Sequence, residues 1–171
     1  YGATEVPAAI TVDECWQLVE TAERTGAQCM MLENYCYFRD VTAVLNMVNA
    51  GLFGELAHCE TGYQHDTRYV VFGPDGELLW RAHHKITRNG NLYPTHALGP
   101  AAWWLGIGRG DRMTRLVSMS SASRGLNDYA ADKFGEDHPA ARQQYSQGDI
   151  NTTLIRTGRG RNDKRQWLLI K

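Results

Sequence analysis

The chain has 171 residues, enough for one domain with a core of its own. Its 18 Lys and Arg residues nearly balance 19 Asp and Glu residues, and hydrophobic residues make up 43% of the chain. There is no clustered basic face and no run near the roughly 20 apolar residues of a membrane span, which argues against a nucleic-acid or membrane partner.

In the first part of the chain, residues 11–25 are predicted to form a helix. Thr11 suits the N-cap, acidic residues occupy the first turn, and Gly26 ends the run. The short apolar run at 28–32 then predicts a strand buried on both faces, as in a parallel sheet. Cys15 and Cys29 lie in apolar runs and are predicted to be small core residues.

Farther along, the pattern indicates mostly strands with inserted helices. Helices are predicted at 39–50 and 93–105. A turn is predicted at 74–76, an excursion with short helices at 123–145, and a hairpin turn at 158–164. Strands are predicted at 55–63, 70–72, 78–80, 113–121, 150–157 and 166–170.

This order predicts an α/β (α+β) fold in which the end of a Rossmann domain runs into an open, largely antiparallel sheet with helices on one face. Residues 1–37 are interpreted as the end of the dinucleotide-binding domain and residues 38–171 as part of a substrate-binding domain. The chain begins abruptly, stops within a predicted strand and contains no GxGxxG turn. We therefore expect a piece shortened at both ends, with any phosphate-binding loop upstream of Tyr1.

Two stretches place polar side chains where strands end. Glu33 and Asn34 follow the 28–32 strand, the position at which open α/β sheets bind ligands, although a helix cap would use the same residues. Residues 62–66 put Tyr63 and three further hydrogen-bonding side chains in a row, which a surface turn would explain equally well.

Two further stretches offer basic and aromatic groups. Arg81 has a rigid guanidinium that can hold a hydroxyl, while the adjacent His83 and His84 would point to opposite sides of a strand. Tyr93 and His96, three residues apart, would share one face at a helix N-terminus and together can exchange protons. A histidine that merely caps the helix is the alternative. Neither HExxH nor CxxC spacing occurs, so no metal site is expected.

Taken together and in order, several motifs resemble the NAD-dependent α-N-acetylgalactosaminidases of glycoside hydrolase family 109, within the glucose–fructose oxidoreductase and inositol dehydrogenase superfamily. The resemblance runs from about Glu5 to Ile155. Its motifs are EVPAA from residue 5, DECW from 13, MLEN from 31, VLNM from 44, FGEL from 53, GYQHD from 62 and LYPTH from 92.

The resemblance implies a role for each matching residue. Glu5, Val6, Glu33, Asn34 and Tyr93 would lie at the NAD cofactor. The sugar would contact Tyr63, Arg81, Tyr93, Pro94, Thr95 and His96. The resemblance also implies a mechanism in which NAD⁺ oxidises the sugar at C3, the C2 proton is removed and the glycosidic oxygen is eliminated. Water then adds, and NADH returns the hydride. This mechanism is an exception to the rule that glycosidases use two carboxylates. His96 or Tyr93 would transfer the C2 proton, and the other would orient the C3 hydroxyl.

The resemblance also separates branches of the superfamily. Dehydrogenases usually carry Glu–Lys–Pro where this chain has Glu33–Asn34–Tyr35. The lysine helps to position or deprotonate the hydroxyl that is oxidised. Asn34 cannot do this, which favours the glycosidase. The 69–79 stretch is shorter than in the family, and the chain ends before a downstream sugar-contacting tyrosine. The shorter stretch bears on substrate range, whereas the missing tyrosine, together with the missing half of the Rossmann domain, implies that the piece alone is inactive.

The implied partner is a glycan with terminal N-acetylgalactosamine, and the open sheet would allow a homo-oligomer. A sugar or polyol dehydrogenase using NAD(P) and a non-catalytic sugar-binding relic remain the alternatives. Localisation stays open between export by the twin-arginine route, common in the family, and the cytoplasm.

Overall fold

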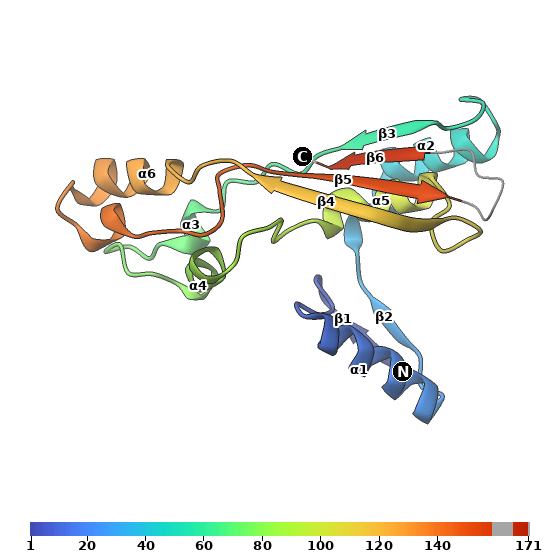
Figure 1. The fold of residues 1–171 in the computed structure, drawn as a ribbon, viewed down its shortest axis with the longest axis horizontal. Helices are drawn as coiled ribbons and strands as arrows, with labels where there is room; N and C mark the ends of the chain where they lie inside the picture. The colour runs from blue at the N-terminus through green and yellow to red at the C-terminus, as the bar shows by residue number, and fades with distance from the viewer. Residues whose placement is uncertain (159–165, 171) are drawn as a thin grey trace.

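The computed structural model describes residues 1–158 and 166–170 (Figure 1). Its first unit consists of β1 (Gly2–Thr4), α1 (Val12–Thr25) and β2 (Cys29–Met31). β1 and β2 pair in parallel, with Ala3 opposite Met30, which confirms the predicted helix and parallel-type strand. The predicted cap is also present, because Thr11 Oγ1 accepts from Glu14 N and Glu14 Oε2 accepts from Thr11 N.

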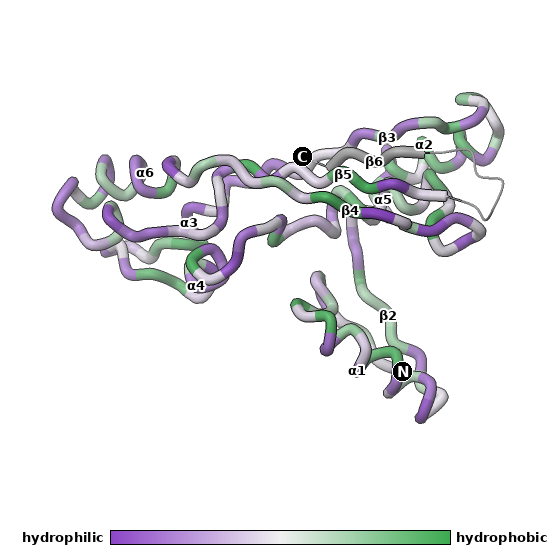
Figure 2. The backbone as a smooth tube through the Cα atoms, in the orientation of Figure 1, coloured by the Kyte–Doolittle hydropathy of each residue, from purple (hydrophilic) through white to green (hydrophobic). Residues whose placement is uncertain are grey.

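The predicted burial of this unit is wrong. Met30 is 50% exposed and Met31 39%, and the Cys15 and Cys29 side chains are also exposed. The strand β2 is hydrophobic, as Figure 2 shows, yet among the described residues its only sheet neighbour is β1. A pair of three-residue strands with one helix cannot cover both faces of a sheet, so the apolar run remains accessible.

The second unit is a four-stranded sheet with the order β3-β6-β5-β4. Its strands are β3 (His58–Thr61), β4 (Arg112–Ser120), β5 (Asn151–Gly158) and β6 (Gln166–Ile170). β4, β5 and β6 are antiparallel, and β3 runs parallel to β6. The predicted strands and hairpin pairing are confirmed, whereas the hairpin turn beyond Gly158 lies outside the described residues.

Helices cover one face of this sheet (Figure 1). α5 (Thr95–Trp104) packs on the strands, and α2 (Arg39–Asn49) packs against α5, as the helical patterns predicted. The core between α5 and the sheet is formed by Ala97, Ala101, Leu105 and Ile155. Between β2 and α2, the short 3-10 helix η1 (Asn34–Tyr37) carries the chain from the first unit to the second.

Beyond the end of the sheet lies a third cluster of helices, seen at the left of Figure 1. It contains α3 (Arg68–Val71), α4 (Trp80–Thr87), α6 (Gly125–Phe134) and the 3-10 helix η2 (Pro139–Arg142). Their shared core is Val71, Phe72, Ala82, Ala130 and Ala140. The short helices expected at 123–145 are confirmed, as is the 74–76 turn, in which Gly76 has φ +80°.

Two strand predictions in this cluster are wrong. Val70 and Val71 belong to helix α3, and Trp80 begins helix α4; an isolated bridge between Phe72 and Leu78 is the remaining strand-like feature of these two stretches. A three-residue apolar run fits a buried helix as well as a strand, because periodicity cannot separate them at that length. Contacts with α6 and its neighbours decide the outcome.

No helix in the described part of the chain is long and apolar enough to cross a membrane. All four cysteines are free thiols, so no disulfide joins the units.

Candidate functional site

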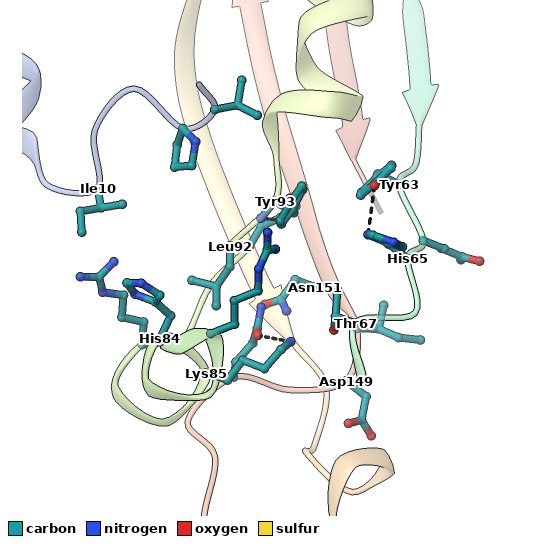
Figure 3. Close-up of a pocket in the computed structure, with 18 of the residues that line it drawn as sticks. Ile10, Tyr63, His65, Thr67, His84, Lys85, Leu92, Tyr93, Asp149 and Asn151 are labelled. Carbon is teal, nitrogen blue, oxygen red and sulfur yellow. Dashed lines mark hydrogen bonds between the residues drawn. The ribbon is translucent and has the colours of Figure 1, made fainter. Parts of the chain in front are cut away.

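A cavity of about 520 Å³ lies between the first unit and the helix cluster (Figure 3). Val6 and Pro7, just beyond β1, form one side of it. The other walls come from the segment after β3, from α4, from the loop before α5 and from the segment before β5. Their lining residues are Tyr63, Gln64, His65, Thr67, Trp80, Arg81, His84, Lys85, Arg88, Asn91, Leu92, Tyr93, Gln147, Asp149, Ile150 and Asn151, with Ile10 beside Pro7.

Glu33 and His96 form a buried pair behind this cavity. Glu33 Oε1 lies 2.7 Å from His96 Nδ1, and the two side chains are 7% and 9% exposed. Glu33 Oε1 also accepts from Tyr35 N at the start of η1, which fixes the carboxylate. The other oxygen, Oε2, is buried without a hydrogen-bond partner among the described residues. A carboxylate bonded to one imidazole nitrogen holds that ring's orientation.

Gly99 makes this pair sterically possible. A Cβ atom at Gly99 would come within 2.6 Å of Glu33 Cγ and 2.9 Å of Cys36 Sγ. The α5 backbone can therefore approach Glu33 only because residue 99 has no side chain.

Three tyrosines surround the His96 ring. Its centroid lies 4.5 Å from that of Tyr35, 4.7 Å from that of Tyr63 and 5.1 Å from that of Tyr93. Tyr63 and Tyr93 are stacked, with centroids 5.5 Å apart, and both line the cavity. Burial, together with hydrogen bonding to Tyr35, raises the pKa of Tyr63 to about 12. The Tyr63 phenol therefore stays protonated at neutral pH and can donate a hydrogen bond to a ligand.

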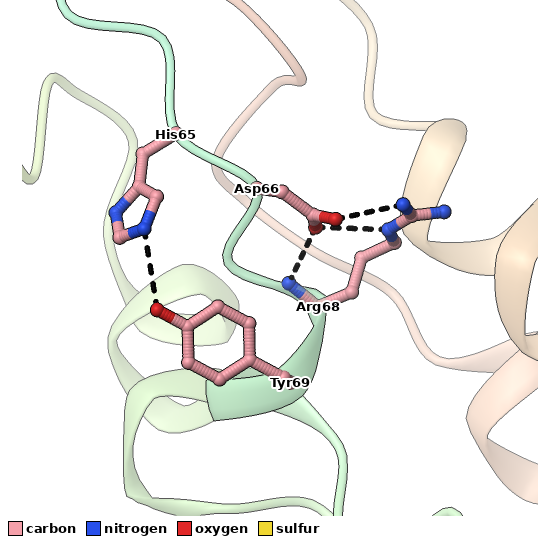
Figure 4. A network of polar contacts seen from close by, with 4 residues as sticks. All are labelled: His65, Asp66, Arg68 and Tyr69. Atoms are coloured by element: carbon pink, nitrogen blue, oxygen red, sulfur yellow. Dashed lines mark hydrogen bonds and ion pairs between the residues drawn. The ribbon is translucent and has the colours of Figure 1, made fainter.

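The segment after Tyr63 is held by two local contacts. His65 accepts or donates at both ring nitrogens, 3.1 Å from Tyr63 Oη and 3.2 Å from Tyr69 Oη. Asp66 binds the Arg68 guanidinium at 2.9 and 2.7 Å and accepts from Arg68 N (Figure 4). The Arg68 contacts lower the pKa of Asp66 to about 2. These contacts brace residues 63–69, so Tyr63 and His65 present a defined surface to the cavity.

Arg81 reaches the cavity from α4, not from the strand that the sequence predicted. Its guanidinium carbon lies 4.8 Å from the Trp80 ring centroid and 5.2 Å from that of Tyr93. Its Nε is buried and has no hydrogen-bond partner within the described residues, so it can donate to a ligand. Because this segment is helical, the reasoning about alternate sides of a strand was wrong; His84 lines the cavity and His83 does not.

Tyr93 and His96 do come together, with ring centroids 5.1 Å apart, and His96 bonds Glu33, the residue before Asn34. The expected reason is only half correct, because α5 begins at Thr95 and Tyr93 lies in the preceding loop. There, Asn91 Oδ1 accepts from Tyr93 N at 3.0 Å.

The remaining predicted residues lie around the cavity but do not line it. Pro94 is the N-cap of α5 and Thr95 its first residue, while Glu5 and Asn34 are exposed near the ends of β1 and β2. His96 lies behind Tyr63 and Tyr93, away from the lining. Their contacts with sugar or cofactor stay predictions.

Sequence reasoning missed two sets of residues. Tyr35 touches both His96 and Tyr63, and its position directly after Glu33 and Asn34 was the available signal. The basic residues His84, Lys85 and Arg88 join Arg81 at i, i+3, i+4 and i+7 spacing along α4, a signal visible only once the segment is known to be helical. No cluster able to hold a metal ion occurs within 1–158 and 166–170.

The model of the protein family described as "Glycosyl hydrolase 109, C-terminal domain" matches residues 37–167. The chain belongs to glycosyl hydrolase family 109. A family 109 protein of Solibacter usitatus is 51% identical over 159 residues, covering 93% of this chain and 36% of the relative. Proteins named alpha-N-acetylgalactosaminidase are 50% identical in Bacteroides fragilis and 46% identical in Tannerella forsythia. Each match covers 94% of this chain and under two fifths of the relative, 39% and 38%.

Solved structures share the fold of this family 109 chain, which confirms the predicted α/β class. An NAD-binding oxidoreductase from Klebsiella pneumoniae superposes with a TM-score of 0.62 at 14% identity, covering 99% of this chain and 40% of that one. An oxidoreductase from Agrobacterium radiobacter, in complex with NAD⁺, L-tartaric acid and magnesium, gives 0.57 at 15% identity, covering 98% and 39%.

Proposed function

We propose that the complete protein is a glycosidase that removes terminal α-linked N-acetylgalactosamine with NAD as a resident cofactor. The family and the names of relatives near 50% identity support the substrate. The observation that carries the proposal is the buried Glu33–His96 pair beneath two cavity-lining tyrosines. That arrangement places Tyr93 at the cavity surface in ring contact with His96, so the two groups can together pass a proton to or from a ligand.

The residues beyond β1 and β2 suit a nicotinamide. Val6 lines the cavity, and Glu5, the residue before it, is exposed, as is Asn34 at the start of η1. We take residues 1–37 as the end of the cofactor-binding domain, because carboxyl ends of parallel strands are where such domains bind dinucleotides. When bound, NAD supplies two-electron oxidation and re-reduction at the sugar C3.

The chain's own residues would perform the binding and proton transfer. Arg81, through its unpartnered Nε, and the Tyr63 hydroxyl would hold sugar oxygens. His96 or Tyr93 would move the C2 proton, which becomes acidic once C3 is a ketone, and the other would orient the C3 hydroxyl. Glu33 would fix the orientation of the His96 ring.

The test is exchange of the C2 proton with solvent deuterium in the complete enzyme. We expect His96→Ala and Tyr93→Phe each to slow exchange and bond cleavage by about 10²–10³. Exchange at the normal rate in both variants would exclude these two residues as the proton-transfer groups.

A dehydrogenase makes a different prediction. Assays with an aryl α-N-acetylgalactosaminide, with and without added NAD⁺, should release the phenol without net NADH. Stoichiometric NADH would instead assign a sugar dehydrogenase, and tight binding without cleavage would assign a sugar-binding relic.

We also propose a homo-oligomer through the uncovered face of the sheet. Val117 pairs with Leu154, and Met119 with Thr152, on the side away from buried Ile155; the three apolar side chains are 58%, 37% and 68% exposed. Val117→Asp should shift the complete protein to a smaller species in light scattering, whereas Arg112→Asp at the strand end should not. Export by the twin-arginine route stays a prediction.

A further inference from the structure

The wall of the cavity formed by α4 is basic. Arg81, His84, Lys85 and Arg88 all line the cavity. Their spacing puts them on one face of the helix and its C-terminal end. We call this set the basic wall. Figure 3 shows His84 and Lys85 on this wall, with Ile10 across from His84.

The acidic groups near the basic wall are already engaged. Asp149 lines the cavity, but its two oxygens accept from the backbone N–H groups of Arg124 and Gly125 at the start of α6. Glu14, on α1, accepts from the N–H groups of Ile10 and Thr11. Those two bonds lower the pKa of Glu14 most, and Arg88 lowers it further. Both carboxylates thus cap backbone, and neither forms an ion pair with a guanidinium of the wall among the described residues.

Lys85 is committed to the fold. Its Nζ donates to Gln147 Oε1 at 2.8 Å, and burial lowers its pKa, which Asp149 partly offsets. Arg81 and Arg88 therefore provide the permanent positive charges of the wall that are available to a ligand. His84 lies between them along the helix.

An aromatic surface adjoins these cations. Trp80 is 63% exposed, lines the cavity, and carries the Arg81 guanidinium on its face. A flat indole beside a sugar site offers apolar contact to a second ring, and neighbouring guanidinium groups bind carboxylate, sulfate or phosphate in a forked geometry.

We propose that the basic wall is a subsite for an anionic substituent on the aglycone, the part of the glycan released when terminal N-acetylgalactosamine is cleaved. The inference rests on the proposed glycosidase function and specifies its substrate class as acidic glycoconjugates. The same anion chemistry is present in the phosphates of a dinucleotide. Dinucleotide-binding domains, however, hold the pyrophosphate at a glycine-rich turn. Residues 1–171 contain no GxGxxG sequence, so α4 does not follow such a turn, and we assign the basic wall to the aglycone.

The test compares two probes in the complete, NAD-loaded protein: phenyl α-N-acetylgalactosaminides with a para carboxylate or a para carboxamide. These probes have similar shape and differ in charge. We expect the wild-type protein to favour the carboxylate, and Arg88→Gln to lower the carboxylate-to-carboxamide ratio of kcat/KM by roughly fivefold. Arg88→Lys should retain part of the preference, and Arg112→Gln, on β4, should retain all of it.

Binding separates this inference from the glycosidase assignment. Calorimetric Kd values for the two probes need no turnover, so a carboxylate preference that Arg88→Gln removes supports the subsite even if neither probe is cleaved. Cleavage with equal affinity for both probes, at 0.05 M as well as 0.5 M salt, overturns the subsite and leaves the glycosidase standing. A loss of NAD affinity in Arg88→Gln without loss of carboxylate preference also overturns it, because it assigns the wall to the cofactor.

Discussion

The two walls of the cavity are built on different physical principles. The aromatic wall consists of Tyr63 and Tyr93, backed by Tyr35, His96 and Glu33. Ring contacts and a buried hydrogen bond join these residues, so each side chain has a fixed position before ligand binds. The basic wall on α4 instead presents long, partly exposed cations, and within the described part of the chain only Lys85 of this wall donates to a side-chain partner.

This difference teaches where chemistry and selectivity are expected to lie. Proton transfer requires fixed geometry, because small displacements of the reacting groups cost large factors in rate. Recognition of a charged substituent tolerates mobile side chains, and charges open to water contribute modestly and weaken with salt. Changes to the aromatic wall should therefore act on kcat, and changes to the basic wall on KM and substrate choice.

The largest effect is expected from Glu33→Gln. The amide would weaken the hydrogen bond that orients His96, so kcat should fall by about 10² or more while the fold is retained. The measurement is steady-state kinetics on an aryl α-N-acetylgalactosaminide across pH 5–9. Glu77→Gln, at an exposed turn, is the matched control. A change in KM alone for Glu33→Gln would contradict a role of the aromatic wall in proton transfer.

A smaller loss is expected from Gly99→Ala. The added methyl group would overlap Glu33 Cγ and Cys36 Sγ, so Glu33 must move away from His96. We expect about tenfold lower kcat and roughly 1–3 kcal/mol lower stability by thermal unfolding. Gly125→Ala is the control, because its methyl group would make only ordinary contacts, at 3.5 Å or more, with Asp149. Equal behaviour of the two variants would contradict the close approach of α5 to Glu33.

Tyr35→Phe should have a milder effect. The phenyl ring keeps its packing against His96, while the hydroxyl that interacts with Tyr63 is lost. A severalfold lower kcat with an unchanged KM is expected, since a typical hydrogen bond contributes about 1 kcal/mol. Tyr37→Phe, on the same 3-10 helix and 60% exposed, should behave as wild type.

The smallest effect is that of Tyr63 titration on the free energy of unfolding at alkaline pH. The folded-state pKa of Tyr63 is raised from 10 to about 12, so the unfolded chain loses this proton first as pH rises. Folding stability should therefore be constant below pH 10 and decline between pH 10 and 12 from this group. Denaturant unfolding of wild type and Tyr63→Phe at pH 9 and 11 measures it; the decline should be smaller in the variant. An equal decline in both would mean that Tyr63 titrates normally.

Local sequence signals determined much of the framework. The capping residues Thr11 and Glu14, with Gly26 at the other end, mark α1, and helical periodicity marks α2 and α5. Alternation and turn residues mark β4 and the β5–β6 hairpin. These signals suffice because caps, periodicity and turns depend on neighbours a few residues away. The resemblance of short motifs to family 109 supplied the candidate residues, since pattern alone left each one with an ordinary structural explanation.

Only the tertiary structure decided the rest. Val70 and Val71 became helical beside the core shared with α6, Trp80 became the first residue of α4, and the 28–32 run stayed exposed because a two-stranded sheet cannot cover it. The bond between Glu33 and His96 joins residues 63 positions apart, and the basic wall exists because α4 is a helix. Sequence spacing sets which side chains are neighbours along one element, whereas packing between distant elements sets which side chains share a cavity.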